Sequence, residues 1–136
     1  MHSQKYILLV EDCEADIRMF LFLLKQQGFP GRVEVLKDGR EALEFLSLSA
    51  LLPVAIIVDA CLPGLSGIEV IRHIKVQPGA CHVPVVVWSS AEYARDREAC
   101  EGLSGVRYLP KPFDLCEWEQ QVDQFMCEWA QIEAGG

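Results

Sequence analysis

Short apolar runs alternate with segments of helical periodicity along the whole chain. Each run is about five residues long and rich in residues that favour β-structure, which is typical of strands. Two of them are apolar throughout, as expected of strands that are buried on both faces. The five predicted strands are Tyr6–Val10, Arg32–Leu36, Val54–Val58, Pro84–Trp88 and Val106–Leu109.

The segments between these runs carry apolar residues three and four positions apart, which predicts one buried face on each helix. Gly28 is placed to end the first helix. Asp38 is placed to cap the second helix, with Glu41 three residues later as the partner in a capping box. The predicted helices are Glu14–Gln27, a helix that begins after Asp38, Gly67–Val76, Ala91–Glu101 and Asp114–Ile132.

Five strands in alternation with five helices predict an α/β fold, a doubly wound parallel sheet with helices on both faces. The 136 residues fit one domain, 1–136, and the hydrophobic content of 51% is enough for a packed core. In open sheets of this class the ligand site lies outside the carboxyl ends of the strands. The residues that follow each strand are therefore the first candidates for chemistry.

The charge balance bears on the possible binding partners. The formal net charge is −8 and no run of five basic residues occurs, which argues against nucleic acid and anionic membranes as partners. Apolar runs such as Met19–Leu24 and Pro53–Val58 are far too short to span a bilayer. The polar N-terminus does not resemble a signal peptide, so we expect a cytoplasmic protein.

The cysteines are spread evenly and form no CxxC pair, and no Cys/His group has zinc-ligand spacing. The apolar content does not call for disulfides, so we expect reduced thiols. The six cysteines are Cys13, Cys61, Cys81, Cys100, Cys116 and Cys127.

Acidic, hydroxyl and basic side chains follow four of the predicted strands. Glu11 and Asp12 follow the first strand, Asp59 the third, Ser89 the fourth and Lys111 the fifth. Close carboxylates repel one another and need a cation or a proton, and oxygen ligands suit Mg²⁺. A carboxylate can also act as the nucleophile in phosphoryl transfer, with Mg²⁺ and a lysine balancing the charge of the transferred group.

Four segments together resemble the receiver domain of bacterial two-component response regulators. They are ILLVEDCEADIR (7–18), IIVDACLPGLSGIEV (56–70), PVVVWSS (84–90) and YLPKPF (108–113), in the order and spacing of that family. The length and the residues E-A-D-I-R make the chain most similar to the small stand-alone receivers that serve phytochrome-type histidine kinases. The resemblance implies the flavodoxin-like receiver fold, with strand order 2-1-3-4-5 and no output domain.

The resemblance also assigns roles to residues. Asp59 matches the aspartate that accepts the phosphoryl group from a histidine kinase. Asp12 and Asp59 match direct ligands of Mg²⁺ (or Mn²⁺), and Glu11 matches a residue that acts on the metal through water. The backbone carbonyl of Cys61 matches the third protein ligand.

The remaining matches concern the response to phosphorylation. Ser89 and Lys111 match the hydroxyl and the ammonium group that approach the phosphoryl group. Tyr108 matches the aromatic side chain that changes rotamer, so that the surface of the fourth helix, fifth strand and fifth helix changes. Pro112 matches a proline usually preceded by a cis peptide bond. Only before proline does the cis isomer cost little free energy.

The resemblance implies a signalling module that catalyses its own phosphotransfer and dephosphorylation and turns over no metabolite. Its expected partners are a sensor histidine kinase and a downstream protein or phosphotransfer partner, with neither nucleic acid nor membrane involved. The aromatic stripe from Trp118 to Trp129 is first of all core, and it also offers apolar surface for a homodimer through the C-terminal helix.

Three alternatives belong to other classes. A phosphatase of the haloacid dehalogenase type has a second Asp two residues after its nucleophile, where this chain has Cys61. A flavodoxin-like flavin protein has a Ser/Thr/Gly-rich phosphate loop after the first strand, where Glu11 and Asp12 would repel phosphate. A receiver that signals without phosphate would share the fold, and only experiment separates it from the leading hypothesis.

Overall fold

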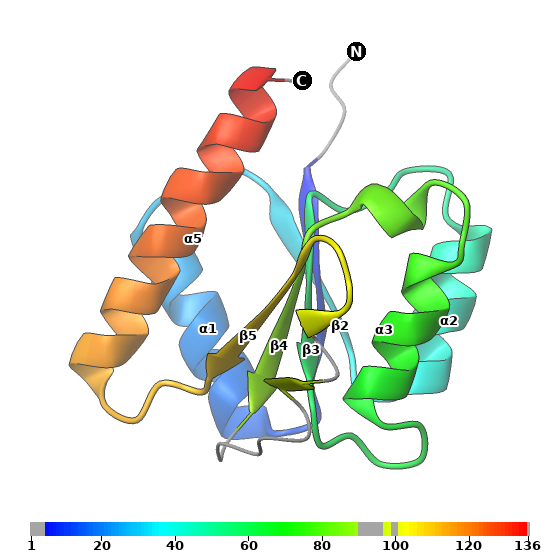
Figure 1. Cartoon of the computed structure of the whole chain (residues 1–136). Helices are drawn as coiled ribbons and strands as arrows, with labels where there is room; N and C mark the ends of the chain where they lie inside the picture. The colour runs from blue at the N-terminus through cyan, green and yellow to red at the C-terminus, as the bar shows by residue number, and fades with distance from the viewer. Residues whose placement is uncertain (1–4, 90–96, 99–100, 136) are drawn as a thin grey trace.

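The computed structural model describes residues 5–89, 97–98 and 101–135. Its five strands form one parallel sheet in the order β2-β1-β3-β4-β5, which confirms the expected fold (Figure 1). Within the described residues, no helix is long and apolar enough to cross a membrane. The strands are β1 (Tyr6–Val10), β2 (Arg32–Leu36), β3 (Ala55–Asp59), β4 (Val85–Ser89) and β5 (Val106–Pro110).

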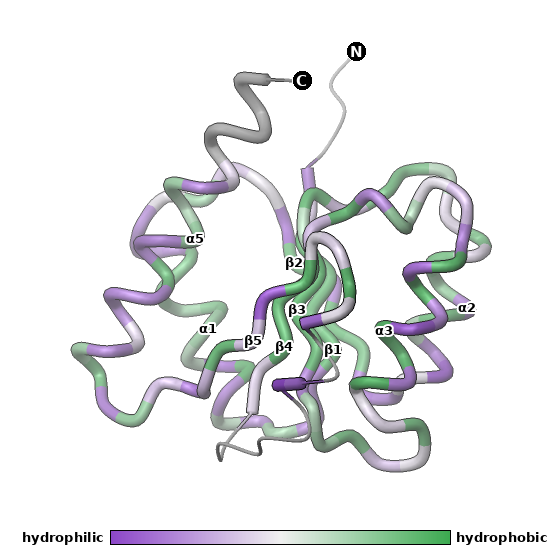
Figure 2. Tube along the Cα trace, in the orientation of Figure 1, coloured by the Kyte–Doolittle hydropathy of each residue, from purple (hydrophilic) through white to green (hydrophobic). Residues whose placement is uncertain are grey.

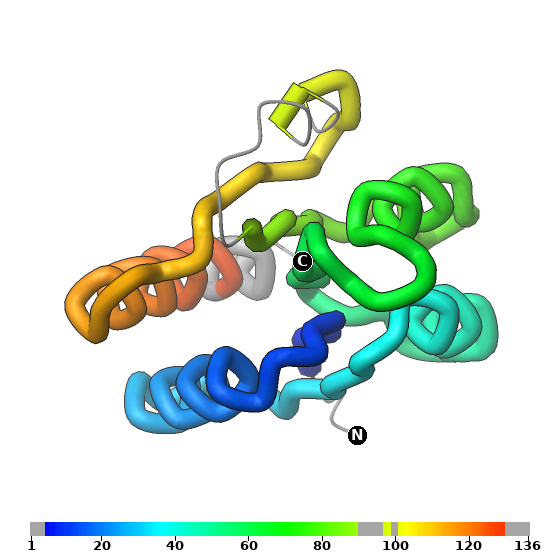
Figure 3. Tube along the Cα trace, turned by 90° about the horizontal axis from the view of Figure 1, so that it is seen from below, coloured from blue at the N-terminus to red at the C-terminus, as the bar shows by residue number. Residues whose placement is uncertain are grey.

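Helices cover both faces of this sheet. Helices α1 and α5 lie on one face and α2 and α3 on the other (Figures 1 and 3). The predicted helix Ala91–Glu101 falls mostly outside the described residues. The helical elements within them are α1 (Glu14–Gln26), α2 (Gly39–Leu48), α3 (Gly67–Lys75), the 3-10 turn η1 (Ala80–His82) and α5 (Leu115–Gly135).

The core consists of two apolar layers, one on each side of the sheet. Successive side chains of a strand point to opposite faces, so Leu8 and Val10 contact the α2–α3 layer while Ile7 and Leu9 contact the α1–α5 layer. The three inner strands β1, β3 and β4 are buried along their whole length. This explains their continuous apolar sequence, which appears as green tube in the middle of Figure 2.

The ends of the helices follow the local signals in the sequence. Gly28 adopts a positive φ of 84° just after α1, a conformation that glycine reaches without steric cost. The side chain of Asp38 accepts a hydrogen bond of 2.7 Å from the backbone N–H of Arg40, so its predicted capping role is confirmed. Ser66 caps α3 in the same way by accepting from the backbone N–H of Glu69.

An aromatic cluster joins α1, β4 and α5. Trp88 is fully buried in its centre, and its ring makes edge-to-face contacts with Phe20 and Trp118. Phe125 and Trp129 stack on each other farther along α5. The predicted aromatic stripe of the last helix therefore packs into the core.

Gly67 is where α3 begins, and it touches the end of β3. A Cβ atom at this position would lie 2.3 Å from the backbone oxygen of Asp59 and 2.8 Å from the Cα of Ala60. The glycine therefore allows the helix to pack directly against the backbone that carries Asp59.

We expect Gly67→Ala to lower the free energy of unfolding by about 1–3 kcal/mol, because the added methyl group overlaps backbone atoms that cannot rotate away. Gly102→Ala is the matched control, since a Cβ there meets open space, and it should change stability by less than about 0.5 kcal/mol. Chemical denaturation measures both. Equal stability of the two variants would contradict the predicted overlap.

Candidate functional site

The pairing of β1 with β3 places two acidic residues side by side at the carboxyl edge of the sheet. Val10 pairs with Val58, so the next residues along the two strands, Glu11 and Asp59, are neighbours. In Figure 1 the strand arrows point downward, and Figure 3 looks at the molecule from that end. The register thus brings together residues that lie 48 positions apart in the sequence.

Three carboxylates converge at this edge. One oxygen from each of Glu11, Asp12 and Asp59 lies within 4.8 Å of the others, which confirms the predicted juxtaposition. Glu11 and Asp59 are buried, with 0% and 4% of their surface exposed, whereas Asp12 is open to solvent. An acidic oxygen cluster with one open side fits a hard divalent cation that keeps part of its water shell.

Backbone N–H groups orient the two buried carboxylates. The Oε2 atom of Glu11 accepts hydrogen bonds of 3.1 Å from the N–H groups of both Asp12 and Cys13. The Oδ1 atom of Asp59 accepts one of 3.0 Å from the N–H of Cys61. Each of these carboxylates therefore has one oxygen engaged by the following loop.

Lys111 supplies the opposite charge. Its Nζ atom lies 3.0 Å from Oε1 of Glu11, 2.8 Å from Oδ2 of Asp16 and 3.5 Å from Oδ2 of Asp59. Burial alone would lower the pKa of this ammonium group. The hydrogen bonds to Asp16 and Glu11 and the negative charges of Glu11 and Asp59 outweigh it, so the pKa of Lys111 is raised and the group stays charged.

Asp16 is the site residue that the sequence analysis did not identify. It lies in the first turn of α1, and helical side chains lean toward the helix N-terminus. In α1 that direction leads back to the carboxyl edge of the sheet. An acidic residue four positions after Asp12 was the available signal, but its meaning depends on where the helix begins.

The carboxyl group of Glu11 has an altered acidity. Its pKa is raised from 4.5 to about 7, first by burial and then by the hydrogen bond with Asp59 and the charge of that residue, while the hydrogen bond with Lys111 lowers it. Near neutral pH, Glu11 therefore exists in both protonated and ionised forms. A bound cation would favour the ionised form.

The residues assigned to switching lie on the neighbouring strands β4 and β5. Ser89 is buried at the end of β4, and its backbone oxygen accepts a 2.7 Å hydrogen bond from the N–H of Lys111. Tyr108 lies half-buried on β5 with the Arg97 guanidinium 5.3 Å from its ring centre, in a cation–π arrangement. Cys61, whose backbone carbonyl was assigned to the metal, is exposed.

The cis peptide bond expected before Pro112 is absent. All peptide bonds of the described residues are trans, so this prediction is wrong for the structure. Trans is the lower-energy isomer before proline by about 0.5–1 kcal/mol. In this trans arrangement Lys111 already reaches the acidic residues, so the contacts of the site do not need the other isomer.

Comparison with known proteins identifies the family. The family model described as the response regulator receiver domain matches residues 7–123. This chain belongs to the response regulator receiver family. The receiver is 33% identical over 138 residues to the response regulator Rcp1 of Synechocystis sp. (strain ATCC 27184 / PCC 6803 / Kazusa), an alignment that covers 96% of this chain and 94% of Rcp1.

Two solved structures resemble the receiver over most of its length. The Mn²⁺-bound form of Rcp1 has a TM-score of 0.83 and 32% identity, covering 92% of this chain and 94% of that one. The phosphorylated cyanobacterial phytochrome response regulator RcpA has a TM-score of 0.85 and 32% identity, covering 94% and 95%. The predicted resemblance is confirmed, and this receiver is a phosphoaccepting response regulator of two-component signalling.

The family match decides against the phosphatase and flavodoxin alternatives.

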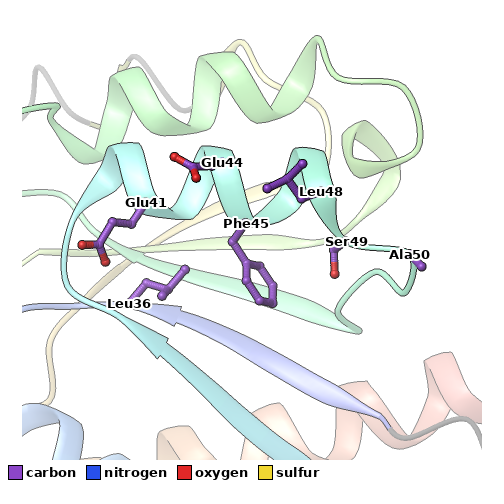
Figure 4. Close-up of a pocket in the computed structure, with 7 residues that line it drawn as sticks. All are labelled: Leu36, Glu41, Glu44, Phe45, Leu48, Ser49 and Ala50. Carbon is purple, nitrogen blue, oxygen red and sulfur yellow. The ribbon is translucent and has the colours of Figure 1, made fainter.

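A pocket of about 610 Å³ between β2 and α2 shares none of its lining residues with the carboxylate cluster (Figure 4). Its lining is mostly apolar, with Phe45 pointing down toward the sheet. The pocket is lined by Leu36, Glu41, Glu44, Phe45, Leu48, Ser49 and Ala50.

The raised pKa of Glu11 predicts a pH dependence of stability in the presence of a metal chelator. The folded protein binds this proton more tightly than the unfolded chain does, because the pKa is about 7 instead of 4.5. The resulting stabilisation is fully present below about pH 4.5 and is lost as the pH rises through about 7; its size is about 3 kcal/mol.

Glu11→Gln removes the titrating group while keeping its shape. The free energy of unfolding of the wild type minus that of this variant should fall between about pH 4.5 and pH 7. Glu14→Gln changes an exposed residue of the next turn and still contains Glu11. The free energy of unfolding of this control minus that of Glu11→Gln should therefore fall over the same pH range. Parallel stability curves for wild type and Glu11→Gln would contradict the assigned pKa.

Proposed function

We propose that Asp59 is the residue of this receiver that accepts the phosphoryl group, with a phosphohistidine of a sensor histidine kinase as the donor. The observation that carries the proposal is the placement of its carboxylate. Asp59 is buried at the end of β3, one oxygen is held by the N–H of Cys61, and the other lies 3.5 Å from the Lys111 ammonium. A carboxylate fixed in this way can act as a nucleophile.

In the transfer, a bond forms between an oxygen of Asp59 and the phosphorus atom while the phosphorus–nitrogen bond of phosphohistidine breaks. The imidazole leaves and an aspartyl phosphate remains. The part of the protein is mainly to position the reactants and balance their charge. Lys111 is placed to pair with the phosphoryl oxygens, and hydrolysis of the aspartyl phosphate by water would end the signal.

We propose Mg²⁺, or Mn²⁺ in its place, as the cation of this receiver. Glu11, Asp12, Asp59 and the backbone carbonyl of Cys61 would hold it, with Glu11 acting through water. The support is the all-oxygen character of the cluster and its open side at Asp12. Such an ion supplies positive charge that stabilises the negative phosphoryl oxygens.

We also propose how phosphorylation is transmitted. Ser89 moves toward the phosphoryl group and Tyr108 takes the space it leaves, which alters the surface around β5 and α5. These 136 residues would act as one receiver, and we propose a protein contact as its output. Its partner is a downstream protein, a phosphotransfer protein or a second copy of this chain that binds near α5.

The similarity to Rcp1 and RcpA supports a kinase of the phytochrome type as the donor. The proposed module catalyses its own phosphorylation and dephosphorylation and has no metabolite as substrate. In this it differs from a receiver that signals without phosphate, whose partner affinity would not depend on a phosphoryl group.

Acetyl phosphate with Mg²⁺ should transfer one phosphoryl group to the wild-type protein, and peptide mass spectrometry should locate it on Asp59. Asp59→Asn should take up none, because an amide is not a competent nucleophile. Asp123→Asn, an exposed change on α5, should be labelled like the wild type. Label retained in Asp59→Asn would show that another residue is the acceptor.

Mg²⁺ should raise the melting temperature of the wild type, because it binds the folded cluster and relieves the repulsion among its carboxylates. The free energy of unfolding should increase by about 2.7 kcal/mol when the free ion is at 100 times its Kd. Asp12→Asn should lose most of this response, while Asp123→Asn should keep it. A melting temperature that Mg²⁺ does not change would overturn the assigned metal site.

A further inference from the structure

We propose that Asp16 is a positioning residue that holds the Lys111 ammonium beside Asp59 during phosphoryl transfer. The inference rests on the proposed function, because it concerns the same reaction. Its basis is the ion pair of 2.8 Å between Lys111 Nζ and Asp16 Oδ2, which is the shortest of the three contacts of that ammonium with carboxylates.

Lys111 needs such a partner because of its position. It follows β5, and only its backbone is fixed there, through the hydrogen bond from its N–H to the Ser89 oxygen. Its long side chain must be ordered to reach the end of β3, and that ordering costs conformational entropy. Asp16 lies in the first turn of α1, and its carboxylate reaches the end of that side chain.

The surroundings strengthen this ion pair. The Lys111 side chain is only 13% exposed and that of Asp16 only 23%, so solvent screens their attraction less than it screens a surface pair. The exposed neighbour Glu14, in the same turn of α1, pairs instead with Lys37 and Arg18. The first turn of α1 therefore contains two acidic residues with different cationic partners.

The three carboxylate partners of Lys111 differ in what happens to them during the reaction. Asp59 becomes an aspartyl phosphate, and Glu11 belongs to the proposed metal cluster. Asp16 belongs to neither group, so its charge and its place on α1 stay constant throughout. A constant partner is what keeps an ammonium group aligned with a reacting centre, where a small displacement is costly for the rate.

The test compares phosphorylation rates with acetyl phosphate at saturating Mg²⁺. Asp16→Asn keeps the shape but removes the charge, and it should lower the maximal rate about 3- to 10-fold with little change in the half-saturating donor concentration. Asp16→Glu restores the carboxylate and should return the rate to within about twofold of wild type. A maximal rate for Asp16→Asn within about twofold of wild type would overturn the proposal.

Two controls separate positioning from a general effect of charge. Glu14→Gln removes the same charge from the same turn without touching Lys111, and it should leave the rate within about twofold. In a Lys111→Ala background, Asp16→Asn should add no further loss, because it acts through that lysine. An equal loss in Glu14→Gln, or a full further loss in the Lys111→Ala background, would refute the positioning role.

A crystal structure of Asp16→Asn gives a readout that does not depend on phosphorylation. The Lys111 Nζ atom should leave its place beside Asp59, and an unchanged Nζ position would overturn the proposal even if the rate fell. If the wild type takes up no phosphoryl group, the proposed function fails first, while the crystal structure still shows whether Asp16 positions the lysine.

Discussion

Mutual repulsion of carboxylates at one edge of the sheet is the constraint around which this site is arranged. Glu11, Asp12 and Asp59 converge there, and the ammonium group of Lys111 contacts Glu11, Asp59 and Asp16. Two of the carboxylates, Glu11 and Asp59, are buried, so neither can be stabilised by bulk water alone. The Lys111 ammonium and backbone N–H groups stabilise the two buried carboxylates, and the raised pKa of Glu11 reduces the negative charge near neutral pH. A divalent cation fits the same need.

This arrangement depends on the parallel sheet. The direct pairing of β1 with β3 sets Glu11 beside Asp59, and the pairing of β4 with β5 brings Ser89 next to the segment that leads into Lys111. Gly67 lets α3 pack on the backbone of Asp59 without a side chain in between. The chemistry therefore rests on strand register and close backbone packing, and both come from residues that take no part in the reaction.

Sequence patterns predicted the fold because each buried strand is a continuous apolar run, and they predicted the acidic cluster because parallel strands end at one edge. Asp16 was missed because its role depends on where α1 begins and how far Lys111 reaches, which are tertiary facts. The prediction for Pro112 came from resemblance and was wrong, since the isomers differ by only about 0.5–1 kcal/mol and local contacts decide between them.

The two faces of β4 differ in their freedom to respond to phosphorylation. Trp88 is fully buried among aromatic rings, and its Nε1–H donates to Oε1 of Gln121 on α5. The amide of Gln121 in turn donates to the backbone oxygen of Pro110 at the end of β5. These contacts tie α5 to the ends of both strands, so on this face a local side-chain change is opposed by the whole cluster.

Ser89, the residue after Trp88, points to the opposite face, where Tyr108 is only half-buried. Under the proposed switch, movement is therefore easier on the Tyr108 side, and any displacement of α5 would carry the ends of β4 and β5 with it.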